Sequence, residues 1–331
     1  MTEYGFVTIN IARHENRMPK LVRAPLREVR SRVFDSARWA NYAPRSDDIV
    51  IATYSKCGTT WMQRIVCMLV FKSADLRPVW ALSPWPDMRL FGPIEETLAQ
   101  AEALTNRRFF KSHLPYDALP VYEGTKFIHV ARDGRDAAMS LYNHFSKFTP
   151  AAWQLTNEVS LGDPKFGTTY PPPPQDPVGF FHDWISGGDG QGDPHSGFFP
   201  VENSYWSARR DANMLLVHYN DLKQDRAGEM RRIAEFLGIE IPKSAWPALI
   251  EGASFEAMKS HANDLIPQAQ LLWEDGANSF LHKGTNGRWR DVAAKEDLAL
   301  YDAKVKAAFS PALARWIEHG RLVAGDPKTT D

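Results

Sequence analysis

Short runs of strand-forming residues alternate with longer amphipathic segments along this chain. The clearest run, residues 49–53 (Ile-Val-Ile-Ala-Thr), is typical of a strand buried on both faces of a parallel sheet. Strands separated by helices favour an α/β fold, and we expect residues 1–331 to form a single domain with a central, mostly parallel sheet flanked by helices. The predicted strands are residues 48–53, 107–111, 125–131 and 213–219, and the predicted helices are residues 60–72, 136–148, 222–237, 294–309 and 311–319.

The overall composition limits the partners and the compartment. With 39 Lys and Arg against 40 Asp and Glu, the chain has no excess positive charge with which to bind nucleic acid. Its two cysteines cannot build a disulfide framework, and no cluster has zinc-ligand spacing. The longest fully apolar run, residues 65–71, is far shorter than the ~20 residues of a membrane span, and residues 1–20 carry no apolar core of signal-peptide length. We therefore expect a cytoplasmic protein.

A Gly/Pro-rich segment lies at about residues 150–200. It contains the run Pro171–Pro174 and the Gly-rich stretch 187–192, so it cannot be one continuous helix or a central strand. Large apolar residues such as Phe181 and Trp184 interrupt it, which a free linker would not tolerate. We expect a long surface excursion that packs back on the domain, and whether it forms a lid stays open.

The loop between the first predicted strand and helix has the composition of an anion site. Lys56 supplies a positive charge, Gly58 allows close backbone approach, and Thr59 and Thr60 supply hydroxyl donors at the helix start. An ordinary capped turn is the alternative. The loop is not a Walker A motif, because its Lys precedes its only Gly by two positions. Nothing in the sequence therefore requires an ATP γ-phosphate or a metal ion.

Two further groups follow predicted strands. Lys111 and His113 lie on the same side of an extended chain, which brings a cation beside a titratable imidazole. Arg132 follows the third strand and Ser140 lies inside the next helix, an arrangement that could clamp a phosphate. Taken alone, each group has an ordinary alternative: a structural histidine in the first case and a solvated charged turn in the second.

Six motifs, in order along the chain, resemble those of the cytosolic PAPS-dependent sulfotransferases, and we identify the chain as a bacterial member of that family. PAPS is 3′-phosphoadenosine 5′-phosphosulfate. Residues 55–61 (Ser-Lys-Cys-Gly-Thr-Thr-Trp) resemble the 5′-phosphosulfate loop, and residues 111–115 (Lys-Ser-His-Leu-Pro) resemble the motif of the catalytic base. Residues 132–140 resemble the 3′-phosphate motif Arg-(x)7-Ser. The other three motifs match at residues 219–223, 254–258 and 283–290.

The resemblance implies a P-loop NTPase-like sulfotransferase fold, PAPS as co-substrate and no required metal. His113 would be the general base, with Lys56 and Lys111 assisting it. The implied donor-binding residues are Lys56, Cys57, Gly58, Thr59, Thr60, Trp61, Arg132, Ser140, Tyr219, Ser254, Phe255, Met258, His282, Lys283 and Gly284.

The implied reaction is in-line transfer of a sulfuryl group to a hydroxyl or amine of a small or lipid-like acceptor. His113 would take the acceptor proton, while Lys56 and the loop N–H groups would stabilise charge on the leaving phosphate. A phenol, an alcohol, an amine or a glycolipid would fit an aromatic site, for which the candidates are Trp85, Phe145, Trp153, Phe181 and Trp184. A P-loop-like kinase and a non-catalytic nucleotide-binding module remain alternatives. An oligomer is possible but not indicated, because the family's C-terminal dimer motif is not recognisable.

The chain departs from the family pattern at several positions. Cys57 stands where Ser is usual, and its place beside Lys56 near a helix N-terminus leads us to expect a lowered thiol pKa and sensitivity to oxidation or alkylation. Ala253 replaces a common Thr, and His282 replaces a common Arg, which would make one positive charge pH-dependent.

Overall fold

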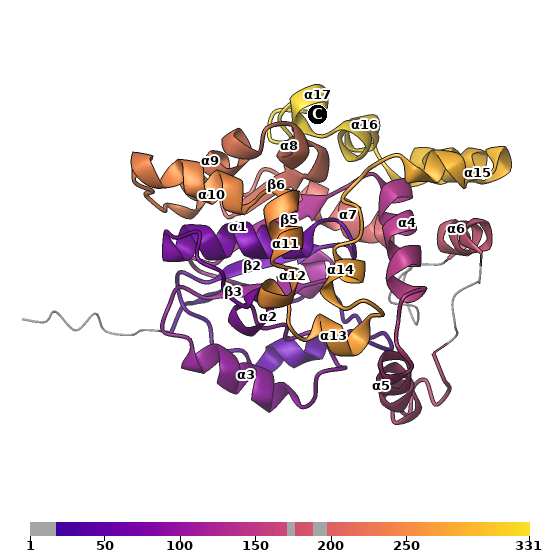
Figure 1. Ribbon diagram of the computed structural model, residues 1–331, viewed down its shortest axis with the longest axis horizontal. Helices are drawn as coiled ribbons and strands as arrows, with labels where there is room; N and C mark the ends of the chain where they lie inside the picture. The colour runs from indigo at the N-terminus through magenta and orange to yellow at the C-terminus, as the bar shows by residue number, and fades with distance from the viewer. Residues whose placement is uncertain (1–17, 171–175, 188–196) are drawn as a thin grey trace, which may run out of the picture.

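A computed structural model describes residues 18–170, 176–187 and 197–331. Within these residues a four-stranded parallel sheet runs in the order β3–β2–β5–β6. Its strands are β2 (Ile49–Thr53), β3 (Phe109–Ser112), β5 (Lys126–Ala131) and β6 (Met214–His218), in the middle of the molecule in Figure 1. The predicted strands and their parallel arrangement are confirmed.

Alternate residues of each strand face opposite hydrophobic clusters, which explains why the strands lack a polar face. Ile49 and Ile51 pack with the buried residues of α1 and α9, whereas Val50 and Ala52 pack on the other side with α4, α7 and α16. Helices thus cover both faces of the sheet.

Helices from both the N-terminal and the C-terminal parts of the chain pack around the sheet (Figure 1). The longer ones are α1 (Thr59–Phe71), α3 (Ile94–Ala103), α4 (Gly134–Phe145), α5 (Pro150–Leu161), α6 (Pro177–Ser186), α7 (Phe198–Ser207), α9 (Arg226–Leu237), α15 (Lys295–Ala308) and α16 (Pro311–His319). The shorter ones are α2 (Val79–Leu82), α8 (Tyr219–Gln224), α10 (Trp246–Gly252), α11 (Phe255–Ser260), α12 (Ala262–Leu265), α13 (Ala269–Leu272), α14 (Ala277–Phe280) and α17 (Arg321–Ala324). The strands β1 (Leu21–Arg23) and β4 (Val121–Tyr122) pair antiparallel to each other.

Two predicted helices differ in their extent. Residues 222–237 form the end of α8 and the whole of α9, separated at Asp225. The Asp225 carboxylate accepts a hydrogen bond from the Gly228 backbone N–H, so it caps a new helix instead of continuing the old one. The predicted helix 136–148 begins earlier, at Gly134, because the Asp133 side chain caps it, and it ends at Phe145.

The described parts of the Gly/Pro-rich excursion contain α5 and α6. On α6, Phe180, Phe181, Trp184 and Ile185 are buried in the cluster on one face of the sheet. The proline run 171–174 and most of the Gly-rich stretch 187–192 lie outside the described residues, as do residues 1–17.

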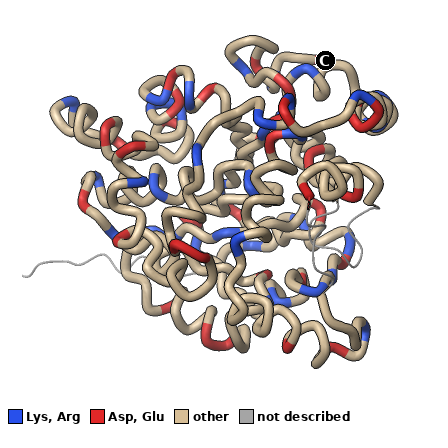
Figure 2. Tube along the Cα trace, turned by 45° about the vertical axis from the view of Figure 1, so that its right-hand side comes forward, with Lys and Arg blue, Asp and Glu red and all other residues tan. Residues whose placement is uncertain are grey.

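Acidic and basic positions are interspersed along the visible trace (Figure 2). Across the described ranges, none of the helices combines the length and apolarity that a membrane crossing demands.

Candidate active site

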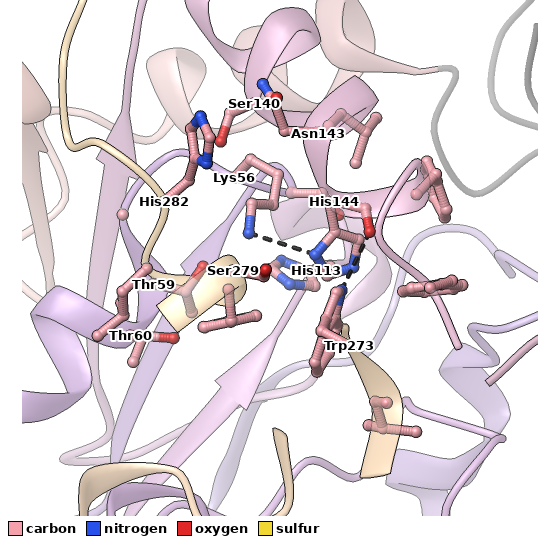
Figure 3. A pocket seen from close by; sticks show the side chains of 18 of the residues that line it. Lys56, Thr59, Thr60, His113, Ser140, Asn143, His144, Trp273, Ser279 and His282 are labelled. Carbon is pink, nitrogen blue, oxygen red and sulfur yellow. Dashed lines mark hydrogen bonds between the residues drawn. The ribbon is translucent and has the colours of Figure 1, made fainter. Parts of the chain in front are cut away.

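The site lies where the parallel strands end. Residues 54–61 follow β2, His113 follows β3, Arg132 follows β5 and Tyr219 follows β6. Because parallel strands end at the same edge of the sheet, these four segments meet there. A cavity at this edge is lined by most of the predicted site residues, namely Lys56, Gly58, Thr59, Thr60, Trp61, Lys111, His113, Arg132, Ser140, Tyr219, Phe255, Met258, His282, Lys283 and Gly284. Figure 3 shows several of them pointing into one space.

The loop before α1 has the backbone shape of an anion cradle. Gly58 is the N-cap of α1 with φ of 111°, and Lys56 also has a positive φ of 66°. A Cβ at position 58 would come within 3.0 Å of the Tyr219 ring, so both the turn and the close approach favour glycine. The loop therefore directs the free backbone N–H groups and the positive end of α1 toward the cavity.

His113 is fixed in orientation by its neighbours. Its Nδ1 lies 2.8 Å from the carbonyl oxygen of Thr53, and its ring packs edge-on against Phe34 and Trp85. A neutral imidazole that donates from Nδ1 to a carbonyl has its basic lone pair on Nε2. The Thr53 hydroxyl also lies 2.7 Å from that of Thr59, which ties the histidine to the start of α1. The arrangement suits proton acceptance at Nε2.

Asp87, which the sequence analysis missed, binds the backbone of His113 and so helps to position it. This fully buried carboxylate accepts hydrogen bonds from the His113 backbone N–H and from the indole N–H groups of Trp39 and Trp85. Burial raises its pKa, against the opposing effect of these hydrogen bonds. Nothing in the segment Trp85-Pro86-Asp87 signals this role, because Trp39 and His113 are distant in sequence.

Two lysines place positive charge in a largely desolvated space. Lys56 Nζ lies 3.3 Å from His144 Nδ1 (Figure 3). It also lies 4.2 Å from the centre of the Phe280 ring. Lys111 Nζ lies 3.3 Å from the centre of a Trp85 ring. Burial lowers the pKa of Lys56 to about 7, with further lowering from Arg132 and Arg288. Burial likewise lowers the pKa of Lys111 to about 7, with Lys56 as the next cause.

Arg132 joins the loop before α1 to the segment 282–288. One guanidinium nitrogen donates to the Lys56 carbonyl at 3.3 Å, and the other donates to the Thr285 carbonyl at 3.0 Å and the Asn286 side chain at 2.8 Å. Its Nε is buried without a hydrogen-bond partner in the described part of the chain, and so is the Nε of Arg288. Both arginines line the cavity, and their guanidinium groups suit an anion there.

Flat apolar surfaces lie beside these cations. The Trp61 indole donates to the Ala253 carbonyl at 2.8 Å, and the Tyr219 ring packs edge-on to it with centroids 5.3 Å apart. Gly284 has φ of 62°, and a Cβ there would come within 2.7 Å of the Phe255 ring. The glycine thus lets the segment 282–288 lie directly over an aromatic ring, which gives a slot suited to a planar base.

Three sequence-based expectations change in the structure. Cys57 is completely buried, and burial raises its pKa well above the usual thiol value, so the expected reactive thiolate is wrong. Cys57 does not line the cavity, and neither does Ser254, whose hydroxyl instead caps α11. His282 does line it, and burial together with Arg288 and Lys283 lowers its pKa.

A large share of the cavity lining is aromatic, and we call this part the aromatic end. Of the five aromatic residues expected there, Trp85 and Phe145 line it, whereas Trp153 does not and Phe181 and Trp184 belong to the core. Sequence reasoning missed several lining residues that carry no motif, namely Phe34, Trp80, Phe91, His144, Phe148, Tyr170, Trp273 and Phe280. Arg288, which also lines the cavity, lies inside the motif 283–290 but was not singled out. In the described ranges no group of three His, Cys, Asp or Glu is placed to hold a metal ion.

The site combines a parallel sheet with an anion cradle at its first loop, and cations and an oriented histidine flank that cradle. Such a site is typical of α/β group-transfer proteins that act on anionic donors. The family model for the sulfotransferase domain matches residues 46–311. The chain therefore belongs to the sulfotransferase family.

Curated relatives agree with this assignment, and solved structures agree with the fold. A glycolipid sulfotransferase of Mycobacterium bovis (strain BCG / Pasteur 1173P2) is 31% identical over 313 residues, covering 88% of this chain and 94% of that protein. Sulfotransferase 1A1 of Rattus norvegicus is 24% identical over 276 residues, covering 80% of this chain and 84% of that protein. Mouse sulfotransferase SULT7A1 complexed with PAP has a TM-score of 0.62 at 21% identity, covering 85% of this chain and 91% of that one. Retinol dehydratase in complex with retinol and PAP has a TM-score of 0.65 at 22% identity, and the match covers 83% of this chain and 85% of that one.

Proposed function

We propose that this chain transfers a sulfuryl group from PAPS to a hydroxyl group of an apolar acceptor, with His113 as the general base. The observation that carries the proposal is that the His113 imidazole, the Lys56 and Lys111 amines and the Arg132 guanidinium line a single cavity beside the start of α1. In the proposed step the acceptor oxygen bonds to sulfur as its proton passes to His113 Nε2. The bond between sulfur and the bridging phosphate oxygen breaks, which releases adenosine 3′,5′-bisphosphate (PAP).

The residues of the basic end fit a doubly phosphorylated adenylate. The loop N–H groups at Gly58–Trp61 and Lys56 would hold the 5′-phosphosulfate. Arg132, Ser140 and Lys283 would hold the 3′-phosphate, and the orphaned Nε of Arg132 supports this assignment. The adenine would lie between Trp61, Phe255 and Tyr219, while Met258 borders the same slot. As charge grows on the leaving phosphate, Lys56 would stabilise it.

The aromatic end favours a neutral acceptor. Among the described residues that line the cavity, none is Asp or Glu, so an ammonium group would find no carboxylate partner. The Trp85 ring already faces the Lys111 amine, and the Phe280 ring faces the Lys56 amine, so neither ring is left for an acceptor ammonium group. From the phenols, alcohols, amines and glycolipids that the sequence allowed, we therefore propose a phenol or an alcohol. A lipid-linked sugar belongs to the same class, and the likeness to a glycolipid sulfotransferase supports its inclusion.

The proposal also covers the domain organisation, the compartment and the partners of the chain. We propose that residues 1–331 act as one sulfotransferase domain in the cytoplasm, with small-molecule partners and no nucleic acid. The balanced charge of 39 basic and 40 acidic residues supports the last point.

The donor can be tested by calorimetry with PAP and with ATP–Mg²⁺, followed by turnover of labelled donor with a panel of phenols and alcohols. We expect PAP to bind and ATP–Mg²⁺ to bind far more weakly. The reverse preference would favour a kinase, and tight PAP binding without turnover of any acceptor would favour a non-catalytic module.

The clamp on the 3′-phosphate can be tested with Arg132→Ala. We expect the affinity for PAP to fall about ten- to hundredfold, because hydrogen bonds to a charged group contribute about 1.5–3 kcal/mol. The exposed Arg231, which lies outside the cavity, gives the matched control Arg231→Ala. An unchanged PAP affinity in Arg132→Ala would contradict the assignment.

Donor binding should depend on pH through Lys56 and Lys111, which line the cavity. Their pKa values are about 7 in the free protein, and a bound anion raises them because it favours the ammonium form. PAP affinity is therefore greatest when both are protonated, and it falls as pH rises above 7, by up to about tenfold per pH unit for each lysine. Calorimetry between about pH 7 and 9 measures this slope. The slope should become shallower in Lys111→Met, and a pH-independent affinity would contradict the expectation.

A further inference from the structure

Two walls of the aromatic end come from distant parts of the chain. The first wall consists of Val33 and Phe34 together with Met88, Leu90 and Phe91. The second wall consists of Ala152, Leu155 and Thr156 on α5 together with Tyr170. We call the part of the cavity that these two sets of residues line the acceptor trough. Its first wall reaches the reaction centre, because the Phe34 ring packs edge-on against His113 with centroids 5.6 Å apart.

An ion cluster joins the segments that carry these walls. Asp163, which is only 2% exposed, follows α5 and directs its Oδ2 at the guanidinium groups of Arg30 and Arg89. The Arg30 contact is 2.9 Å long, and Arg89 also donates to the Ser31 carbonyl at 2.9 Å. The other carboxylate oxygen accepts from the Lys165 backbone N–H at 2.8 Å. One buried carboxylate thus ties the turn after α5 to both stretches of the first wall.

Arg32 adds a second connection between the same segments. Its guanidinium donates to the carbonyl and to the hydroxyl of Thr168, each at 3.0 Å, and it also contacts the Ser160 hydroxyl. Ser160 in turn donates to the Thr168 carbonyl at 2.6 Å. We call the set Arg30, Arg32, Arg89, Asp163 and Thr168 the arginine clasp.

The members of the clasp lie next to wall residues in sequence. Arg32 directly precedes Val33, Arg89 stands between Met88 and Leu90, and Thr168 is two positions before Tyr170. A shift of the clasp therefore moves the side chains that bound the trough. A carboxylate buried between two guanidinium groups resists such a shift, because separating them would leave uncompensated charge.

We propose that the arginine clasp, through Asp163, sets the width of the acceptor trough and so selects acceptors by size. The inference rests on the proposed function, since it takes the trough as the place where the acceptor lies beside His113. Asp163 is a positioning residue in this account, since it does not line the cavity and acts only through the walls that it joins.

The test is Asp163→Asn, which keeps the shape of the side chain and removes its charge. The variant and the unaltered protein are assayed with a one-ring phenol and with a bulky fused-ring alcohol. We expect the ratio of kcat/KM for the bulky acceptor to that for the small one to rise at least about tenfold, mostly through KM. PAP affinity should stay within about twofold. A ratio unchanged within about threefold, in a folded variant that binds PAP, overturns the proposal.

Hydrogen exchange supplies a readout that is independent of turnover. The backbone N–H groups of Phe166 and Gly167 donate to the Asp163 carbonyl, so loosening of the clasp should speed their exchange.

The second variant, Arg32→Gln, weakens only the contacts with Thr168 and Ser160 and leaves those of Asp163 in place. It should shift the acceptor ratio in the same direction, by a smaller factor. If neither variant changes the ratio, the proposal fails even where exchange is faster.

The matched control is Asp297→Asn. Asp297 is also a buried carboxylate, and it contacts His182 of α6 at 3.0 Å, but none of the described residues of α6 lines the cavity. We expect no change in its acceptor ratio, and a shift as large as that of Asp163→Asn would overturn the proposal. Failure of the proposed function would look different, because the unaltered protein would then neither bind PAP nor sulfate either acceptor.

Discussion

His113→Ala is expected to lower kcat by about 10²–10⁴-fold while the affinity for PAP stays nearly unchanged. The imidazole is held by the Thr53 carbonyl on one ring nitrogen, so its other nitrogen is the group proposed to receive the acceptor proton. Alanine removes that proton acceptor and leaves the anion cradle and Arg132 in place. Turnover of labelled PAPS gives kcat, and calorimetry with PAP gives the affinity.

The control for this prediction is another histidine. His261 is about half exposed and does not line the cavity, so His261→Ala should keep normal turnover. Normal kcat in His113→Ala would refute the base assignment. A parallel loss of PAP affinity would instead indicate that the substitution had disturbed the loop before α1.

Lys56→Met is expected to lower kcat by about 10²–10³-fold, the effect typical of losing one group that stabilises charge in the transition state. The reason is the position of Lys56 in the turn before α1, where charge on the leaving phosphate is proposed to grow. Methionine retains much of the length and apolar contact of the side chain but none of its charge. PAP affinity should also fall, though by a smaller factor, because the loop N–H groups remain.

The same helix offers a matched control. Lys72 caps the other end of α1, also with a positive φ, and is exposed. Lys72→Met should leave both kcat and PAP affinity close to normal. If Lys56→Met lost PAP affinity but kept kcat at saturating donor, Lys56 would be a binding residue without a role in the transition state.

The strands and the motif residues could be predicted because both depend on local sequence. A buried parallel strand needs an uninterrupted apolar run, and residues 49–53 supply one. Once the strands are parallel, the residues that follow each of them share one edge of the sheet. This is why Lys56, His113, Arg132 and Tyr219 could be expected together before their distances were known.

The residues that were missed depend on contacts between distant segments. His144 of α4 contacts Lys56 from 88 positions away, and the Trp273 indole donates to the His144 carbonyl from 129 positions away. Cys57 was misjudged for a related reason. A neighbouring lysine and a helix start predict a thiolate, but complete burial opposes charge more strongly than these neighbours favour it.

The contacts of Arg132 with the segment 282–288 carry a consequence for the order of events in a catalytic cycle. In this structure the guanidinium already donates to the Thr285 carbonyl and the Asn286 side chain, and the Gly287 backbone N–H donates to Asp136. A phosphate that took the place of the Thr285 and Asn286 acceptors would displace hydrogen bonds that each contribute about 0.5–1.5 kcal/mol net, whereas one held by Nε alone would leave them in place. We therefore expect the segment 282–288 to compete with the nucleotide for Arg132, so that its contacts would affect the rates at which PAP binds and leaves.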